Sequence, residues 1–145
     1  MEQVGARGGP RDHGIVLGRL PTGRLNAIVD VPGVSVGHAT LADGDLQTGV
    51  TAVLPHCGNL FKEKVPAACR VINGFGKSAG LVQVAELGTI ESPILLSNTF
   101  SVPACIEGGL DLLLAENEDI ARTTGSANVA ALECNDGYLS DMRRR

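Results

Sequence analysis

Alternating residue types predict two β-strands in the first third of the chain. Over residues 34–41, valine, histidine and threonine recur at every second position, which is the period of a strand. An apolar run from Val50 to Leu54 ends at a proline and favours a second strand. Asp43-Gly44 is a turn signal between them. Strands with these bounds lie too far apart for a two-residue hairpin loop.

Helical spacing and a short apolar run predict the next two elements. A helix is expected over residues 79–87, with Ser78 as its N-cap and Gly88 at its end. Residues 94–97 follow Pro93 and are apolar, which predicts a short buried strand. In chain order, this helix would then lie between two strands.

The last third of the chain predicts a longer helix and one more strand. Apolar side chains over residues 101–116 recur at i, i+3, i+4, i+8 and i+11, the pattern of an amphipathic helix. Gly108 and Gly109 lie inside it at a cost of about 1 kcal/mol each relative to alanine, so we expect close packing there. Residues 128–134 predict a final strand. The fold class is therefore mixed α/β, with helices covering faces of a sheet.

Composition fits one folded domain. The chain has 145 residues, 43% of them hydrophobic and 19% charged, which is not the composition of a disordered chain. It has three Phe, one Tyr, no Trp and a formal charge of −4, which argues against a nucleic-acid partner. We expect a polar arm over residues 1–21, a domain over residues 22–142 and a basic tail over residues 143–145.

The cysteines do not form a metal or redox motif. They are Cys57, Cys69, Cys105 and Cys134, and no two of them have CxxC spacing. No apolar leader is visible at the N-terminus, and no apolar run approaches the roughly 18 residues that span a bilayer. We expect reduced thiols in a cytoplasmic protein with no membrane partner.

The glycine-rich segment before the first helix resembles a phosphate-binding loop only in part. Gly76-Lys77-Ser78 fits the end of that motif, but Val71 stands where the motif needs its first glycine. Nucleotide binding is therefore not predicted. The backbone N–H groups of this turn remain candidates for holding a carboxylate or a carbonyl.

Two further clusters can carry chemistry, and each has a plain structural alternative. Asn98 follows a buried strand, where α/β proteins place active groups, and its amide can orient a substrate carbonyl or cap the next helix. Residues 133–138 hold two carboxylates, an amide and the tyrosine. A carboxylate there can anchor a cationic amine, or the segment can be an Asx-type turn with solvated carboxylates.

Six segments together resemble one family. They are residues 25–38 (LNAIVDVPGVSVGH), 48–55 (TGVTAVLP), 73–81 (NGFGKSAGL), 96–102 (LSNTFSV), 122–125 (RTTG) and 133–139 (ECNDGYL). In this order they resemble the DmpA-like aminopeptidases, the L-aminopeptidase/D-esterase and β-peptidyl aminopeptidase family. The resemblance covers nearly the whole chain from about residue 22.

The resemblance implies an αββα sandwich related to N-terminal-nucleophile hydrolases, incomplete in this chain. Such enzymes cut themselves at a Gly-Ser bond, and the freed serine becomes the nucleophile, with its α-amine or a neighbour as base. Substrates are short peptides, amides or esters with a free amine. No metal or other cofactor is implied, and the complete enzymes are homo-oligomers.

The resemblance also implies the substrate-binding residues. These are Glu133 for the substrate ammonium, Asn135 in the same pocket, Asn98 as support, and Asn73, Gly74 and Gly76 in a loop near the pocket. Family members tend to have a small residue where this chain has Leu132.

The resemblance places the self-cut serine beyond the Asp-Gly-Tyr-Leu segment, and this sequence ends seven residues after Tyr138. Gly125-Ser126 lies upstream of the family's cut site. We therefore expect no catalytic nucleophile here, an N-terminal fragment that is inactive alone, and a C-terminal part as its partner. Open sheet edges and apolar faces should result. The alternative is a non-catalytic small-molecule-binding or partner subunit derived from the same half-fold.

Overall fold

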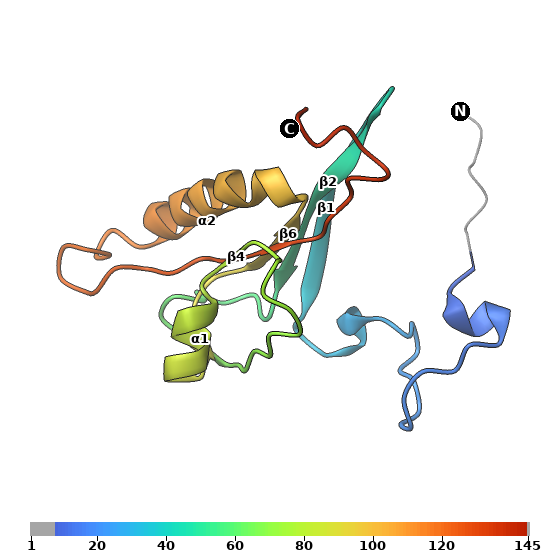
Figure 1. The fold of residues 1–145 in the computed structure, drawn as a ribbon. Helices are drawn as coiled ribbons and strands as arrows, with labels where there is room; N and C mark the ends of the chain where they lie inside the picture. Colours follow the sequence, from blue (N-terminus) through green and yellow to red (C-terminus); the bar gives the residue numbers. More distant parts are fainter. Residues whose placement is uncertain (1–7, 145) are drawn as a thin grey trace.

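A five-stranded sheet in the order β1-β2-β6-β7-β4 forms the centre of the molecule (Figure 1). Its strands are β1 (Ser35–Asp43), β2 (Leu46–Leu54), β4 (Ser78–Ala79), β6 (Ile94–Ser97) and β7 (Ala130–Glu133). β6 and β7 run parallel, and the other neighbours are antiparallel. A second sheet pairs β3 (Val65–Pro66) with β5 (Thr89–Ile90). The structure is a computed structural model that describes residues 8–144, so part of the expected arm and Arg145 lie outside the described residues.

The β1–β2 hairpin is longer than the sequence pattern predicts. Asp43 pairs with Leu46, so Gly44 and Asp45 alone form the loop. The prediction that the spacing excludes a two-residue loop was therefore wrong. Gly44 has φ +56°, a left-handed conformation that glycine tolerates at the first position of such a loop. Polar and small residues next to the turn hid the strand ends from the hydrophobic pattern.

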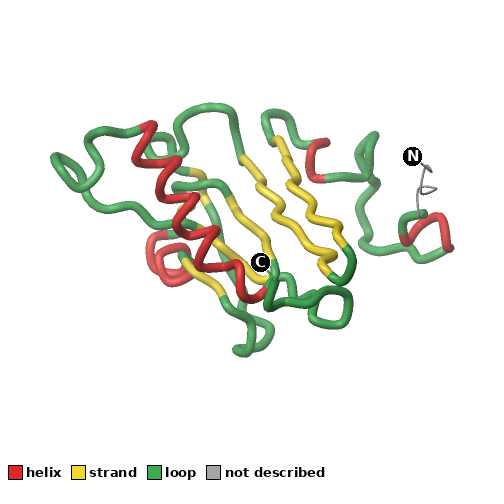
Figure 2. The backbone as a smooth tube through the Cα atoms, turned by 90° about the horizontal axis from the view of Figure 1, so that it is seen from above, coloured by secondary structure: helices red, strands yellow, loops and turns green. Residues whose placement is uncertain are grey.

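Helix α2 (Val102–Glu116) covers one face of the sheet, over β6 and β7 (Figure 2). A 3-10 turn, η3 (Thr99–Ser101), leads into it, and the expected bounds are confirmed to within one residue. The buried core lies between this helix and the sheet. Its members are Phe61, Val102, Cys105, Leu113, Ile120, Val129 and Ala131.

One of the two glycines inside α2 makes a close contact. A Cβ on Gly109 would lie 2.5 Å from Val129 Cγ1 and 3.1 Å from Leu95 Cδ1, so the helix packs tightly on β6 and the segment before β7. A Cβ on Gly108 would have no atom within 4 Å. The expectation of close packing is confirmed for Gly109 and was wrong for Gly108, which faces away from the sheet.

Helix α1 (Leu81–Leu87) begins later than the sequence predicts. Ser78 is not its N-cap, because Ser78 and Ala79 pair with β7 as strand β4. Gly80 occupies the N-cap position with φ +81°, and a Cβ there would lie 2.6 Å from the Val129 carbonyl oxygen. Gly88 ends the helix as expected, with φ +66° and an N–H that donates to Val84 O at 3.0 Å.

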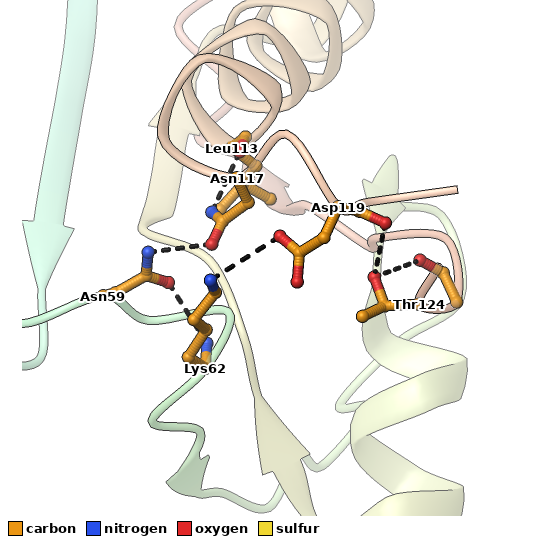
Figure 3. Close-up of polar contacts among 7 residues, drawn as sticks. Asn59, Lys62, Leu113, Asn117, Asp119 and Thr124 are labelled. Atoms are coloured by element: carbon orange, nitrogen blue, oxygen red, sulfur yellow. Dashed lines mark hydrogen bonds and ion pairs between the residues drawn. The ribbon is translucent and has the colours of Figure 1, made fainter. Parts of the chain in front are cut away.

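A polar network ties the loop after β2 to the end of α2 (Figure 3). Asn117 follows the last residue of α2, and its Nδ2 donates to Leu113 O at 2.9 Å. Its Oδ1 accepts a hydrogen bond from Asn59 Nδ2 at 2.8 Å. Lys62 and Asp119 form an ion pair at 3.6 Å beside them. The buried amide of Asn117 thus satisfies an orphan carbonyl of the helix and fixes the loop.

Glu91 joins three segments of the chain, its own, the one with Lys64 before β3 and the one with Asn128 before β7. The residue is only 2% exposed, and its carboxylate accepts hydrogen bonds from Lys64 Nζ and from Asn128 N, the latter at 2.8 Å. Burial by itself raises the pKa of Glu91. The hydrogen bonds from Lys64 and Asn128 and the charge of Lys64 outweigh burial and hold the pKa below its ordinary value.

The β1–β2 hairpin stands away from both helices (Figure 1). Within residues 8–144, no strand pairs with the outer edge of β1. Val36, Val53 and Leu96 are only half-buried on the hairpin and on β6. An open edge and a partly exposed apolar surface are therefore present, as expected.

The chain segments before β1 and after β7 lie largely on the surface. The described part of the expected arm has one 3-10 turn, η1 (Pro10–His13), and another, η2 (Ile28–Asp30), precedes β1. Near the other terminus, Arg144 Nη2 contacts Asp43 Oδ2 at 3.1 Å, so the basic tail reaches the hairpin loop. Among the described residues, no helix has the length and apolar character needed to cross a bilayer.

Candidate functional site

Glu133 ends strand β7 and is held by the backbone of Lys77. The Lys77 N–H donates to Glu133 Oε2 at 2.9 Å, and the Glu133 N–H donates to Lys77 O at 3.0 Å. The strand bonds between β4 and β7 place these two residues side by side. A backbone N–H of the glycine-rich turn therefore does hold a carboxylate, and that carboxylate belongs to the protein itself.

The loop before β4 is shaped by contacts of its side chains, and not by close packing of other atoms against its glycines. Asn73 Oδ1 accepts a hydrogen bond from Phe75 N at 3.1 Å, which closes an Asx turn. The ammonium of Lys77 donates to Phe75 O at 2.9 Å and lies 3.7 Å from the centroid of the Phe75 ring. Neither Gly74 nor Gly76 has an atom within 4 Å of where a Cβ would be. These contacts fix the wall that holds Glu133.

An open cavity of about 610 Å³ lies between this loop, the start of α1 and the end of β7. Four of the six predicted site residues line it together, namely Asn73, Gly74, Gly76 and Glu133. Its aliphatic lining comes from Val71, Ile72, Leu81 and Leu132. The cationic side chains in the lining are Arg70 and Lys77. We call this space the Glu133 cavity.

Asn98 lies outside the lining of the Glu133 cavity. Its Oδ1 accepts from Ser101 N at 2.9 Å, so it caps the turn that starts α2. Its Nδ2 donates to Thr48 Oγ1 at 3.1 Å, and the residue is buried. Both ends of the amide are therefore committed to protein partners, which is the helix-cap alternative of the sequence analysis.

Asn135 also lies outside the lining of the Glu133 cavity. Its Oδ1 accepts from Gly137 N at 3.0 Å, which forms the Asx-type turn that the sequence left open as an alternative. The side chain is exposed. The structure thus brings Glu133 and the 73–76 loop together and leaves the two remaining asparagines elsewhere.

Sequence reasoning noted Asp136 only as one of two carboxylates in residues 133–138, and it missed the contact of Asp136 with Thr48. The Thr48 hydroxyl donates to Asp136 Oδ2 at 2.5 Å and accepts from Asn98 Nδ2. Asp136 Oδ1 is buried and has no hydrogen-bond partner among residues 8–144, so this carboxylate is not solvated as the turn alternative assumed. Both residues line a second hollow of about 330 Å³, together with His38 and Cys134. Thr48 and Asp136 are 88 positions apart, and no local pattern reveals such a pair.

The described residues hold no group of three or more His, Cys, Asp or Glu side chains arranged to bind a metal ion. The chemistry that the Glu133 cavity can support by itself is ionic and hydrogen-bonded recognition. A single carboxylate beside an aliphatic wall suits an organic cation that has an apolar body.

Comparison with known proteins agrees with the motif resemblance. The profile of peptidase family S58 matches residues 26–145. β-Peptidyl aminopeptidase BapA of Sphingosinicella xenopeptidilytica is 41% identical over 141 residues, which cover 91% of this chain and 34% of that protein. BapA of Sphingosinicella microcystinivorans is 38% identical over 101 residues, covering 63% of this chain and 25% of the relative. The chain thus spans about a third or less of the length of these relatives.

Solved structures share the fold over most of the chain. A protein from Pyrococcus horikoshii OT3 is 51% identical, with a TM-score of 0.83, and the match covers 89% of this chain and 39% of that one. A Burkholderia sp. β-aminopeptidase is 39% identical, with a TM-score of 0.73 and coverage of 90% and 37%. The L-aminopeptidase D-Ala-esterase/amidase of Ochrobactrum anthropi, described as a new variant of the Ntn hydrolase fold, is 26% identical, with a TM-score of 0.76 and coverage of 92% and 39%. The expected fold class is confirmed, as part of that fold.

Proposed function

This chain belongs to peptidase family S58, and from that premise we propose that it forms the amine-binding part of a self-processing serine aminopeptidase. The nucleophilic serine would be carried by a segment outside these 145 residues. The substrates would be short peptides, amides or esters with a free N-terminal amine. Alone, the chain would bind such molecules without cleaving them.

The observation that carries this proposal is the way Glu133 is held. The Lys77 N–H donates a hydrogen bond to Glu133 Oε2. The other carboxylate oxygen, Oε1, can accept hydrogen bonds from further donors. Within the described residues, no hydrogen bond engages Oε1. An ammonium group that enters the cavity would therefore find a fixed, charged acceptor, and charge-assisted hydrogen bonds are the stronger kind.

The other predicted residues would act around Glu133. The 73–76 loop would form one wall of the pocket, and the aliphatic side chains would contact the carbon skeleton of the substrate. Asn98 would be a positioning residue, because it links α2 through Thr48 to Asp136, three residues after Glu133. Asn135 would shape the turn between them. The serine hydroxyl of the other segment would attack the substrate carbonyl, the amine would leave, and water would release the acyl product.

The open side of the sheet supports a missing partner part. Residues 22–142 would be one portion of a larger domain, with the edge of β1 and the half-buried surface around Val36 and Val53 facing the remainder. Edges and apolar faces of this kind are normally covered in a stable enzyme. Relatives about three times as long have enough additional chain to cover them.

The proposal is tested first by ligand binding. Alanine amide should bind at least about tenfold more tightly than N-acetylalanine amide in ligand-observed NMR, because acetylation removes the charge that Glu133 recognises. Glu133→Gln should abolish this difference, whereas Glu118→Gln, an exposed glutamate that lines no cavity described above, should preserve it. Equal binding of the two amides would count against the amine site.

Activity and mass provide the second test. The purified chain should release no p-nitroaniline from alanine p-nitroanilide, and turnover that survives removal of contaminating peptidases would contradict the proposal. Mass spectrometry of the protein from its native source should reveal a longer precursor and two processing products. A native protein of 15.0 kDa without any such precursor would favour the alternative of a stand-alone binding subunit.

A further inference from the structure

The Glu133 cavity contains charges of both signs, and the amine site uses only one of them. Arg70 lines the same cavity as Glu133. Its side chain is exposed, and within residues 8–144 it makes no hydrogen bond or ion pair. The other cation in the lining, Lys77, already donates to Phe75 O and stacks on the Phe75 ring. Arg70 is therefore the cation that remains available to a ligand.

We propose that the Glu133 cavity selects short peptides that carry both free termini, with Glu133 holding the ammonium and Arg70 the carboxylate. This inference rests on the proposed function for the ammonium end and adds a residue that determines specificity at the other end. Arginine suits this role because its planar guanidinium can pair with both oxygens of a carboxylate. Peptides with a free carboxylate would then bind better than the corresponding amides or esters.

The rest of the lining fits a zwitterion with a small apolar body. Val71 and Ile72 directly follow Arg70, and Leu81 and Leu132 come from α1 and β7. A ligand charged at both ends and aliphatic between them would therefore meet matching groups along the cavity. The volume of about 610 Å³ lies within the roughly 300–1,000 Å³ usual for small-molecule pockets.

Three dipeptide probes separate the two ends of the ligand. Alanyl-alanine, alanyl-alanine amide and N-acetyl-alanyl-alanine are titrated against the full chain by calorimetry and ligand-observed NMR. Alanyl-alanine should bind about threefold to fivefold more tightly than its amide, the range expected for a solvent-exposed ion pair. Raising the salt concentration should reduce this ratio, because salt screens exposed charges.

Variants then assign the effect to residues. Arg70→Gln should lower the affinity for alanyl-alanine to that of the amide and leave the affinity for the amide unchanged. Arg70→Lys should keep part of the preference, because the charge remains and the bidentate geometry is lost. Arg122→Gln is the matched control, an exposed arginine in the segment before β7 that lines no cavity described above, and it should change neither affinity. Arg70 lies on an exposed loop, so circular dichroism should show unchanged folding for all three proteins.

The outcomes distinguish this inference from the proposed function beneath it. If Arg70→Gln leaves the preference for alanyl-alanine over its amide intact, the carboxylate site is overturned while the amine site stands. If N-acetylation and Glu133→Gln have no effect either, the proposed function fails as well. Absence of binding by all three probes at concentrations up to about 10 mM would overturn both.

Discussion

Two halves of the same sheet differ in what covers them. β6 and β7 lie under α2, where Ala131 has no exposed surface and Leu113 of the helix is 1% exposed. The β1–β2 hairpin lies beyond the helix, and Leu41 on it is 50% exposed. Figure 2 shows the long helix over one half and the two longest strands outside it. Both halves have regular strand pairing, so backbone hydrogen bonds alone do not distinguish them.

The difference indicates which half stabilises the chain. Free energy of folding comes mainly from apolar surface removed from water, and the helix-covered half contributes most of that surface. Strand β1 of the hairpin contributes pairing and little burial, whereas Val50 of β2 packs against the core, so the exposed apolar positions of β1 should tolerate change. The cavity residues lie at the edge of the helix-covered half, where β7 and β4 meet, so the better-packed half supports the candidate site.

The largest expected effect comes from the core leucine. Leu113→Ala should lower the free energy of unfolding by about 2–5 kcal/mol, because it removes a fully buried side chain and leaves a cavity. Leu41→Ala on the hairpin should cost less than about 0.5 kcal/mol. Urea unfolding followed by circular dichroism measures both. Equal losses would remove the contrast between the two halves.

A smaller effect with a pH signature comes from Glu91. Glu91→Gln should cost about 2–3 kcal/mol at pH 7, because the variant loses a buried, charge-assisted interaction with Lys64. The pKa of Glu91 in the folded protein lies below its ordinary value of 4.5, so this stabilisation is complete above that value. It is lost as the pH falls through the lowered pKa.

The urea midpoints of wild type and Glu91→Gln should therefore converge as the pH falls from 7 to values below 4.5. Lys62→Gln is the control, because the Lys62–Asp119 pair is exposed and should contribute less than about 1 kcal/mol. A constant difference between wild type and Glu91→Gln across this pH range would show that the charge of Glu91 is not what stabilises the fold.

The paired glycines of α2 test the packing of the helix on the sheet. Gly109→Ala should cost about 1–2 kcal/mol, because its Cβ would lie 2.5 Å from Val129 Cγ1 and the gain in helix propensity offsets only part of the strain. Gly108→Ala should stabilise by up to about 1 kcal/mol, because its Cβ meets open space. Thermal unfolding of the two variants shows directly whether each substitution lowers or raises the stability. A stabilising effect of Gly109→Ala would mean that the sheet yields to the added methyl group.

Much of the fold follows from local patterns in the sequence. The six expected elements all exist, and the end of α1 at Gly88 lies where the glycine signal placed it. Errors occurred where tertiary pairing overrides a local signal. Ser78 has the chemistry of an N-cap, but the edge of β7 pairs with it and makes it a strand. The hairpin turn at Gly44 was misjudged because polar and small residues interrupt the apolar pattern on both strands near it, at Asp43 on β1 and at Gln47 and Thr48 on β2.

The candidate site was predictable only as far as its residues are close along the chain or match a family motif. Resemblance indicated Glu133 and the 73–76 loop, and the structure brings them to one cavity. The backbone contact from Lys77 to Glu133 spans 56 positions, so no local period could reveal it. Arg70 has no motif of its own, and its place in the cavity depends on how the loop before β4 folds back.

The most direct test of the open edge of the hairpin comes from Val36 on β1. Val36 pairs with Val53 and is half-buried, and β1 has no partner along its outer edge among the described residues. Unpaired edges recruit other chains, so the wild-type protein should self-associate in sedimentation velocity, and Val36→Lys should shift it toward the monomer. The free energy of unfolding should change by less than about 1 kcal/mol, because little apolar surface is lost. Val82→Lys is the control. Val82 is 80% exposed on α1, and this substitution adds the same charge at a site away from the hairpin. A wild-type protein that sediments as a clean monomer would mean that the hairpin needs no partner, and the contrast between the two halves would then concern burial alone.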